Sequence, residues 1–386
     1  MKLKNYIYGI ALGALSLTVA SCYNADREFP DYQDGTTAYF AYQNPVRTLI
    51  LGNDIYDNTL DNAHKCRIWA TMGGAYGGRN AVADVMVDET LCDNLWFEDE
   101  GGNPSIPVTP LPKDCYNLVG DNGSYNGTIP YNGDARGYIE VEFTDKFFEK
   151  VGAVENTYVI PLLMTKVTGI DRILTGKLRE GLDLSTTSRT NTEDWEVLAK
   201  DYVLYCVKYM NPWQGKYIRR GVDNVTEAGV TKQVIRKDFS LYNSDIEHYS
   251  KQDPSNPVNA NDEVCGIKTK NMTQAIFPVS FQTSGASISC NLILTFSGNT
   301  CTISTDDENV TATGSGEFIT KGTEKPEYKD YQWGSLDGQP VQRDILRLAY
   351  DVNFKDNNIQ VSTTDTLVVQ TRESNKKDFF KYKYVK

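Results

Sequence analysis

Apolar and polar residues alternate in short runs along most of the chain, and this period of two predicts β-strands. Clear examples are "KCRIWATM" at 65–72 and "YIEVEF" at 138–143. Further strand-like runs in the first half lie at 37–42, 47–51, 81–87 and 157–167. Pro161 interrupts the last run and favours an edge position or a bulge there. Short strands between glycine and proline turns predict a β-sandwich over 36–180.

A polar stretch rich in Ser, Thr and Asn indicates a linker over residues 181–200. The alternating strand pattern returns after this linker. Strand-like runs then recur at close spacing up to the C-terminus, and "LTFSGNTCTIS" predicts a hairpin with its turn at 297–299. Successive antiparallel strands favour an up-and-down barrel over 201–386, because closure removes exposed edges and about eight strands can enclose one small ligand. A second sandwich is the alternative. The predicted fold class is therefore all-β.

The N-terminus has the pattern of an export signal. Lys2 and Lys4 precede an apolar run at 6–20, and small residues lead into Cys22. A basic start, a short apolar core and small residues predict a signal peptide at 1–21. The run is too short to span a bilayer comfortably, since a membrane helix needs about 20 apolar residues. A buried N-terminal helix is the alternative.

The residues Val-Ala-Ser-Cys resemble the bacterial lipobox. The resemblance implies cleavage before Cys22 and lipidation of its thiol, and two or more acyl chains anchor a protein stably. Residues 22–35 are polar, carry Pro30 and predict a tether. Asp26 and Glu28 resemble the surface-export signal of Bacteroidetes lipoproteins, although Arg27 interrupts them. The expected location is the outer membrane, with the protein facing the cell exterior.

Composition narrows the function classes. The chain of 386 residues has a formal net charge of −12, and removal of Lys2 and Lys4 with the signal leaves −14. Such an acidic protein is a poor partner for nucleic acid, and its expected contact with the membrane is the lipid anchor alone. The seven other cysteines show no CxxC spacing, and Cys66, Cys206 and Cys290 lie in apolar runs that predict buried thiols. No metal site, cofactor or catalytic motif is predicted.

Several segments in order resemble a family. Those at 73–91, 128–143 and 158–174 resemble the N-terminal domain of unknown function of Bacteroidetes lipoproteins, an immunoglobulin-like sandwich. Those at 207–221 and 365–372 resemble the lipocalin-like domain that often follows it. The resemblance implies a surface glycan-binding role near glycan-import systems of the starch-utilisation type. The implied partners are an oligo- or polysaccharide, a TonB-dependent transporter and the lipoprotein partner of that transporter.

Glycan binding requires aromatic faces with hydrogen-bonding groups around them. The densest such cluster is "YMNPWQGKYIRR", with the candidate residues Tyr209, Asn211, Trp213, Gln214, Tyr217 and Arg219. Two positions are open for its tryptophan, a loop tip at the barrel rim or the barrel base. A second cluster, "DYQWGSLDG" at 330–338, supplies the candidates Tyr331, Trp333 and Asp337. Trp69 alternates within a strand and is expected in the sandwich core.

The predicted function is non-catalytic glycan binding, with the barrel as the expected site and the sandwich as spacer. A glycosidase would need two carboxylates about 5 to 10 Å apart. The acidic runs "FEDEGG" and "STDDENV" have the pattern of solvated turns, and no pair is singled out by its spacing. The alternatives are a structural or partner-docking surface lipoprotein and a glycoside hydrolase or its accessory.

Overall fold

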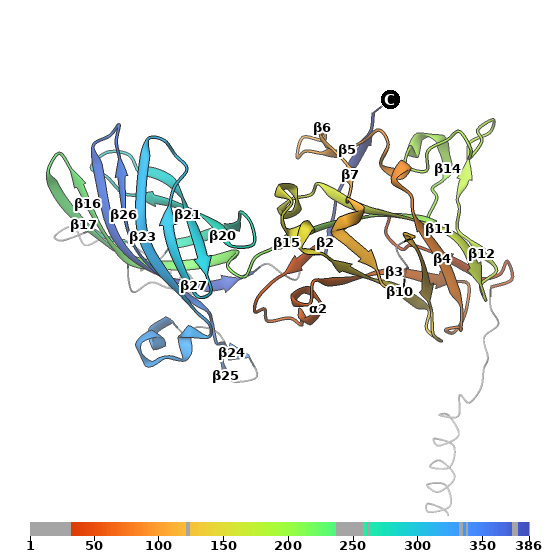
Figure 1. Ribbon diagram of the computed structural model, residues 1–386, viewed down its shortest axis with the longest axis horizontal. Helices are drawn as coiled ribbons and strands as arrows, with labels where there is room; N and C mark the ends of the chain where they lie inside the picture. The colour runs from red at the N-terminus through yellow and green to blue at the C-terminus, as the bar shows by residue number, and fades with distance from the viewer. Residues whose placement is uncertain are drawn as a thin grey trace, which may run out of the picture.

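The computed structural model describes residues 32–120, 124–236, 258–260, 263–331, 335–336, 339–372 and 377–385. They form a layered sandwich and a barrel that lie side by side, with the C-terminus on the sandwich (Figure 1). Almost all regular structure is strand, as the alternating pattern predicts. Helical turns are short and lie in connections: α2 (Thr59–Asn62), α3 (Asp145–Phe148), η2 (Glu89–Cys92), η3 (Lys113–Cys115), η4 (Val151–Val154), η5 (Thr192–Asp194), η7 (Gly322–Glu324) and η8 (Pro326–Tyr331).

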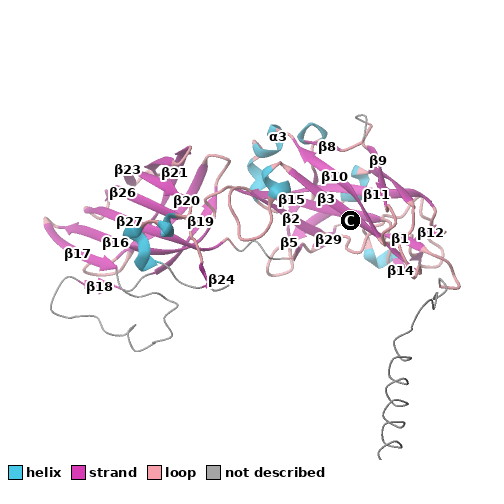
Figure 2. Cartoon of the chain, turned by 90° about the horizontal axis from the view of Figure 1, so that it is seen from below, coloured by secondary structure: helices cyan, strands magenta, loops and turns pink. Residues whose placement is uncertain are grey.

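Two mostly antiparallel sheets form the sandwich. The first sheet has the order β12 (Arg172–Ile173), β1 (Thr37–Tyr39), β3 (Lys65–Gly73), β10 (Arg136–Phe143), β8 (Tyr116–Leu118). The second has the order β28 (Asp378–Phe379), β2 (Pro45–Ile50), β15 (Tyr202–Met210), β11 (Tyr158–Thr168), β4 (Val82–Val87), β9 (Asn126–Pro130), with β7 (Thr109–Pro110) beside β11. Figure 2 shows β3, β10 and β8 together on one side of the sandwich.

One apolar core fills the space between the two sheets. The inward residues of β3 are Cys66, Ile68, Ala70 and Met72, which alternate with outward polar and aromatic residues. Ile160, Leu162 and Met164 of β11 belong to the same buried cluster. The strand β11 is central, so of the two alternatives expected from Pro161 the edge position is wrong, while a bulge or irregularity does occur in β11, between Met164 and Lys166. The proline is tolerated where the β4 ladder ends, since pairing with β4 begins at Leu162.

A third layer covers the other face of the second sheet. It contains β5 (Leu95–Glu98), β6 (Pro104–Pro107) and β29 (Tyr382–Tyr384), with the pair β13 (Lys177–Leu178) and β14 (Trp195–Val197). Phe97, Trp195 and Phe380 pack there with Leu204 and Cys206. Both faces of β15 and β11 are therefore buried, which explains their almost continuous apolar sequences.

The barrel closes because β16 pairs with β27 from Lys216 to Glu227, with one register shift after Lys216. In the described chain it is a closed barrel of eight antiparallel strands. They are β16 (Gly215–Glu227), β19 (Glu263–Thr269), β20 (Gln274–Phe281), β21 (Ile288–Ser297), β22 (Thr300–Ser304), β23 (Val310–Ile319), β26 (Ile345–Phe354) and β27 (Ile359–Thr371). The strand β17 (Val230–Arg236) pairs with β16, and β18 (Val258–Ala260) pairs with β17. The short strands β24 (Ser335–Leu336) and β25 (Gln339–Pro340) pair with each other. The predicted fold class, an immunoglobulin-like sandwich with a lipocalin-like barrel, is confirmed.

The expected domain boundaries need correction at both ends of the barrel. The barrel was expected over 201–386, but β15 is a central strand of the sandwich, and the barrel begins only at β16. After β27 the chain returns to the sandwich, where β28 pairs with β2 and β29 pairs with β5. The barrel is therefore inserted between two strands of the sandwich domain. The expected linker 181–200 also contains β14, whose Trp195 is buried.

Candidate functional site

Most of the first predicted binding cluster is buried: of its six candidate residues, Gln214 is half-buried and the other five are buried. Tyr209 lies in the sandwich core, where its hydroxyl donates to the carbonyl of Phe148 at 3.0 Å. Asn211 is also buried, and its Nδ2 donates to the carbonyls of Asn271 at 3.0 Å and Gln274 at 2.9 Å. These two side chains fix the connection between β15 and the barrel, so they do not form an exposed ligand platform.

The rest of this cluster closes one end of the barrel. Trp213 stacks on Phe296 with 3.7 Å between ring centroids and 5° between ring planes. The hydroxyl of Tyr217 donates to the carbonyl of Trp213 at 2.6 Å, and Gln214 Oε1 accepts the Thr269 N–H at 2.9 Å. Trp213 thus occupies the barrel base, one of the two positions left open for it. The expected binding surface at 209–219 is corrected, because strand pairing turns these polar and aromatic groups inward.

The other predicted positions are only partly described. Tyr331 ends η8, while Trp333 and Asp337 lie outside the described residues, as does the lipidation candidate Cys22. Cys66, Cys206 and Cys290 are free and buried, and burial raises the pKa of the Cys66 and Cys206 thiols to about 12. No helix in the described ranges is long and apolar enough to cross a membrane. No cluster of three or more metal-ligating side chains occurs among the described residues.

A network of ionised side chains occupies the barrel interior. Arg219 Nε donates to Asp365 Oδ2 at 2.9 Å, and its Nη1 donates to Glu263 Oε1 at 2.6 Å. Arg236 donates to Asp223 and, at 3.0 Å, to Asp365 Oδ1. We call Arg219, Asp223, Arg236 and Asp365 the barrel ion network, and all four side chains are at least nine-tenths buried. The candidate Arg219 is therefore held inside the barrel by carboxylates of the chain itself.

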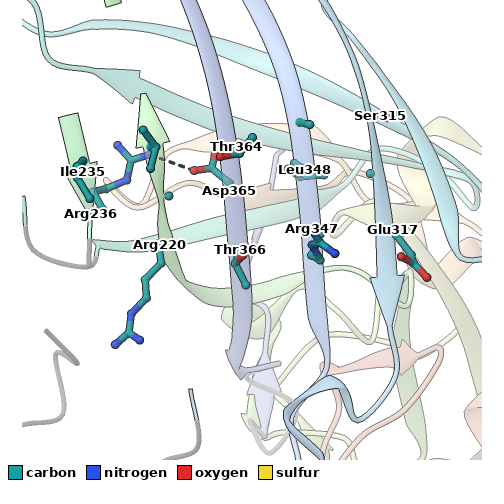
Figure 3. Close-up of a pocket in the computed structure, with 14 residues that line it drawn as sticks. Arg220, Ile235, Arg236, Ser315, Glu317, Arg347, Leu348, Thr364, Asp365 and Thr366 are labelled. Carbon is teal, nitrogen blue, oxygen red and sulfur yellow. Dashed lines mark hydrogen bonds and ion pairs between the residues drawn. The ribbon is translucent and has the colours of Figure 1, made fainter. Parts of the chain in front are cut away.

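A hollow of about 880 Å³ lies at the barrel wall, and Arg236 and Asp365 of the barrel ion network are among the residues that line it. Figure 3 shows Arg220, Thr366, Arg347 and Glu317 across it, and they come from the neighbouring strands β16, β27, β26 and β23. The described lining residues contain no aromatic ring. The hollow therefore lacks the stacking surface that a sugar ring prefers.

Exposed aromatic rings instead lie on the sandwich. Trp69 of β3 and Tyr138 of β10 are directly paired across the first sheet, with 4.7 Å between their ring centroids. The Trp69 side chain is 45% exposed. The Arg136 guanidinium carbon lies over the Trp69 ring, 5.5 Å from its centre, and that of Arg67 lies over the Tyr138 ring, 4.3 Å from its centre. We call Trp69, Tyr138, Arg67, Arg136 and Glu140 the Trp69 platform.

The local sequence explains why the platform faces outward. In β3, every second side chain is buried in the core, namely Cys66, Ile68, Ala70 and Met72. Trp69 lies between two of these positions, so its side chain points to the outer face of the sheet. The expectation that Trp69 lies in the sandwich core is therefore wrong. The alternation in the sequence was enough to predict an outward Trp69. Its side chain is on the same side of the strand as two basic residues, and the four apolar residues are on the other side.

The platform offers both stacking and hydrogen bonding. Glu140 accepts from Lys65 Nζ at 3.2 Å and lies 3.5 Å from Arg67 Nε, which orients the carboxylate beside the Tyr138 ring. The Arg136 guanidinium has no carboxylate within ion-pair distance among the described residues. Aromatic faces, a carboxylate and an unpaired guanidinium on one outward surface can bind a polar, ring-shaped ligand.

Comparisons with known proteins agree with the division into two domains. Residues 212–373 match the family model of a domain of unknown function, DUF5627, and residues 32–171 match a model described as an N-terminal domain. A search of curated proteins found no match. A crystal structure of a Bacteroides ovatus protein of unknown function is 38% identical, with a TM-score of 0.75, over 92% of this chain and 99% of its own. These matches fit the Bacteroidetes part of the resemblance. The chain belongs to the family of that Bacteroides ovatus protein, and the barrel inserted in its sandwich domain is the part that matches the DUF5627 model.

Proposed function

We propose that the protein is a lipid-anchored glycan-binding protein of the outer membrane that captures oligo- or polysaccharide for import without cleaving it. The observation that carries the proposal is the half-exposed Trp69 ring beside Tyr138 on an outward sheet face. Sugar C–H groups pack on aromatic rings while charged and amide groups bind the hydroxyls. The proposal assigns no catalytic residue and no cofactor.

The proposal places the binding site on the sandwich rather than on the barrel. Within the first cluster, Trp213 is 9% exposed, whereas Trp69 is 45% exposed. A ligand can reach Trp69 without any rearrangement of the fold. The barrel then provides a second surface, available for contact with a TonB-dependent transporter or its lipoprotein partner.

Affinity electrophoresis tests the proposal. The chain from Asn24 onward keeps every described residue and is run through gels that contain plant, host or microbial polysaccharides. We expect at least one polysaccharide to retard the protein, and Trp69→Ala to remove the retardation. Tyr42→Ala is the matched control, because Tyr42 is also an exposed aromatic residue, at 54%, and lies outside the platform.

Two outcomes would contradict the proposal. Unchanged retardation of Trp69→Ala would mean that the platform does not bind the glycan. No retardation by any polysaccharide would favour the alternative, a surface lipoprotein that docks a protein partner.

The lipid anchor has a separate test. Cys22→Ser removes the thiol that the lipobox-like sequence would offer for acylation. We expect this variant to leave the membrane fraction of the native host while its fold and its glycan binding remain. Retention of the variant in that fraction would contradict anchoring through Cys22.

A further inference from the structure

Resting on the proposed function, we infer that the glycan at the Trp69 platform is anionic and carries carboxylate or sulfate groups. The platform belongs to a basic sheet face on an acidic protein whose formal net charge is −12. The outward positions of the first sheet hold four cations and two acids: Lys65, Arg67, Arg136 and Arg172 against Glu140 and Glu142.

The charges are unevenly distributed along the strands. At one end, Lys65 Nζ lies 3.2 Å from Glu140 Oε1 and 3.9 Å from Glu142 Oε1. Arg67 Nε lies 3.5 Å from the other oxygen of Glu140. Two cations and two acids therefore compensate one another, and this end of the face is close to neutral.

The other end, beyond Trp69, is positive. Arg136 pairs with Thr71 in the sheet, and on the other side of Thr71 lies Tyr39, whose ring centre is 5.8 Å from Lys200 Nζ. Arg172 follows in the next outward row, next to Asp171, whose carboxyl pKa is lowered by hydrogen bonds from Thr36 and by the charges of Arg79 and Arg172. The nearby carboxylate of Asp134 accepts the backbone N–H of Arg136 at 3.2 Å and forms no ion pair with its guanidinium. Among the described residues, the Arg136 charge beside the exposed tryptophan therefore has no carboxylate in ion-pair contact.

This arrangement suits a sugar ring with an acidic substituent. A pyranose packed against the exposed part of the Trp69 ring would place a carboxylate or sulfate within reach of Arg136, whose guanidinium carbon lies over the same ring, 5.5 Å from its centre. The planar guanidinium matches these oxyanions with two parallel hydrogen bonds. A neutral sugar would offer it hydroxyl partners only, which form weaker bonds with a cation than an anion does.

The test compares anionic with neutral polysaccharides on the chain from Asn24 onward, by affinity electrophoresis and titration calorimetry. The anionic probes are polygalacturonate, for carboxylate groups, and chondroitin sulfate, for sulfate groups. The neutral probes are amylopectin and xyloglucan, and polyglutamate serves as a polyanion without sugar rings. Arg136→Gln removes the charge at the platform, and Arg347→Gln is the matched control, since this arginine is exposed on the barrel.

We expect at least one anionic polysaccharide to bind, and Arg136→Gln to weaken it about tenfold, as the loss of a charge-assisted hydrogen bond implies. Arg347→Gln should bind like the wild type, and high salt should weaken binding because these exposed charges are screened. Stronger binding of a neutral polysaccharide, or an unaffected Arg136→Gln variant, would overturn the inference while Trp69-dependent binding would still support the proposed function. Equal binding of polyglutamate would overturn the inference too, and no binding at all would overturn both.

Discussion

Arg219 and Asp365 form an ion pair inside the barrel, with 2.9 Å between Nε and Oδ2, and neither side chain is exposed to solvent. Asp365 also accepts from Tyr350 Oη at 2.7 Å and from Arg236 Nη2 at 3.0 Å. A buried charge is tolerated when partners satisfy it, but removal of one partner leaves the other charge uncompensated. The barrel ion network therefore makes the barrel dependent on each of its members.

Asp365→Asn tests this dependence. The substitution keeps the side-chain volume but leaves two buried guanidinium groups short of negative charge, so we expect unfolding to require about 3–5 kcal/mol less free energy. Urea denaturation followed by circular dichroism measures the loss. Asp351→Asn on the exposed side of β26 is the control and should stay within about 0.5 kcal/mol of the wild type. Equal stability of the two variants would contradict the role of the network.

The same network predicts how stability depends on pH. Burial opposes ionisation of Asp223, but its hydrogen bonds to Arg236 and the charges of Arg236 and Arg219 outweigh burial and hold the pKa of the carboxyl below its usual value. A carboxyl whose folded pKa is lowered stabilises the fold above its unfolded pKa, about 3.9, and this stability is lost as pH falls through the folded value.

We therefore expect the contribution of Asp223 to be constant from pH 7 to about pH 5 and to fall below about pH 4. Asp223→Asn should be less stable at pH 7 and should lose less further stability between pH 5 and pH 3 than the wild type. Denaturation midpoints of the two proteins at each pH give this difference, in which the other titrating groups cancel. Parallel pH profiles would show that Asp223 does not titrate in this way.

Trp213 and Trp69 should respond oppositely to truncation. Trp213 is buried against Phe296, so Trp213→Ala leaves a cavity at the barrel base and should cost about 3–5 kcal/mol of stability. Trp69→Ala on the outer sheet face should change stability by about 0.5 kcal/mol or less. Thermal unfolding measures both effects. Acrylamide should quench less fluorescence in Trp69→Ala than in the wild type, and an unchanged quenching would mean that Trp69 is not exposed.

Arg372 joins the end of the barrel to the sandwich. Its Nη1 donates to the carbonyls of Leu51 at 2.7 Å and Asn53 at 2.9 Å, and its Nη2 donates to the carbonyl of Asn211 at 2.7 Å. Burial lowers the pKa of this guanidinium, and backbone carbonyls supply its partners here. Arg372→Ala would leave these carbonyls without their donor.

We expect Arg372→Ala to weaken the coupling between the two domains. Calorimetry should show a broader or divided unfolding transition, and limited proteolysis should cut faster between the domains. Arg372→Lys should restore part of the coupling, because an ammonium group supplies three donors but not the planar fork. A single transition identical to that of the wild type would contradict a bridging role.

The class of the fold could be predicted from sequence because it depends on local alternation. The pattern identified most strands and the hairpin at 297–299, and it predicted a sandwich and a barrel, but not the residues where the barrel begins and ends. It could not place Tyr202–Met210, since a strand buried on both faces has the same sequence whichever domain contains it. The C-terminal strands β28 and β29 could not be placed either. Their pairing partners, β2 and β5, lie far away in the sequence.

The candidate site was harder to predict for a related reason. The run at 209–219 contains the aromatic and polar residues of a sugar site, but tertiary pairing turns Trp213 and Arg219 into the barrel. Composition cannot distinguish a buried hydrogen-bonded cluster from an exposed one. The phase of the strand around Trp69 could have identified an outward ring, whereas the neighbouring Tyr138 comes from a strand whose register is fixed only by the fold.

The return of the C-terminus to the sandwich gives the last prediction. Phe380 is 3% exposed and packs with Phe97 in the third layer, while its neighbour Phe379 is 43% exposed. Phe380→Ala should therefore cost about 3–5 kcal/mol of sandwich stability, and Phe379→Ala should cost less than about 1 kcal/mol. Hydrogen exchange measures the two domains separately. In Phe380→Ala we expect faster exchange in β5, β11 and β15 and unchanged exchange in the barrel strands. Faster exchange in the barrel instead would mean that the C-terminal strands belong to the barrel.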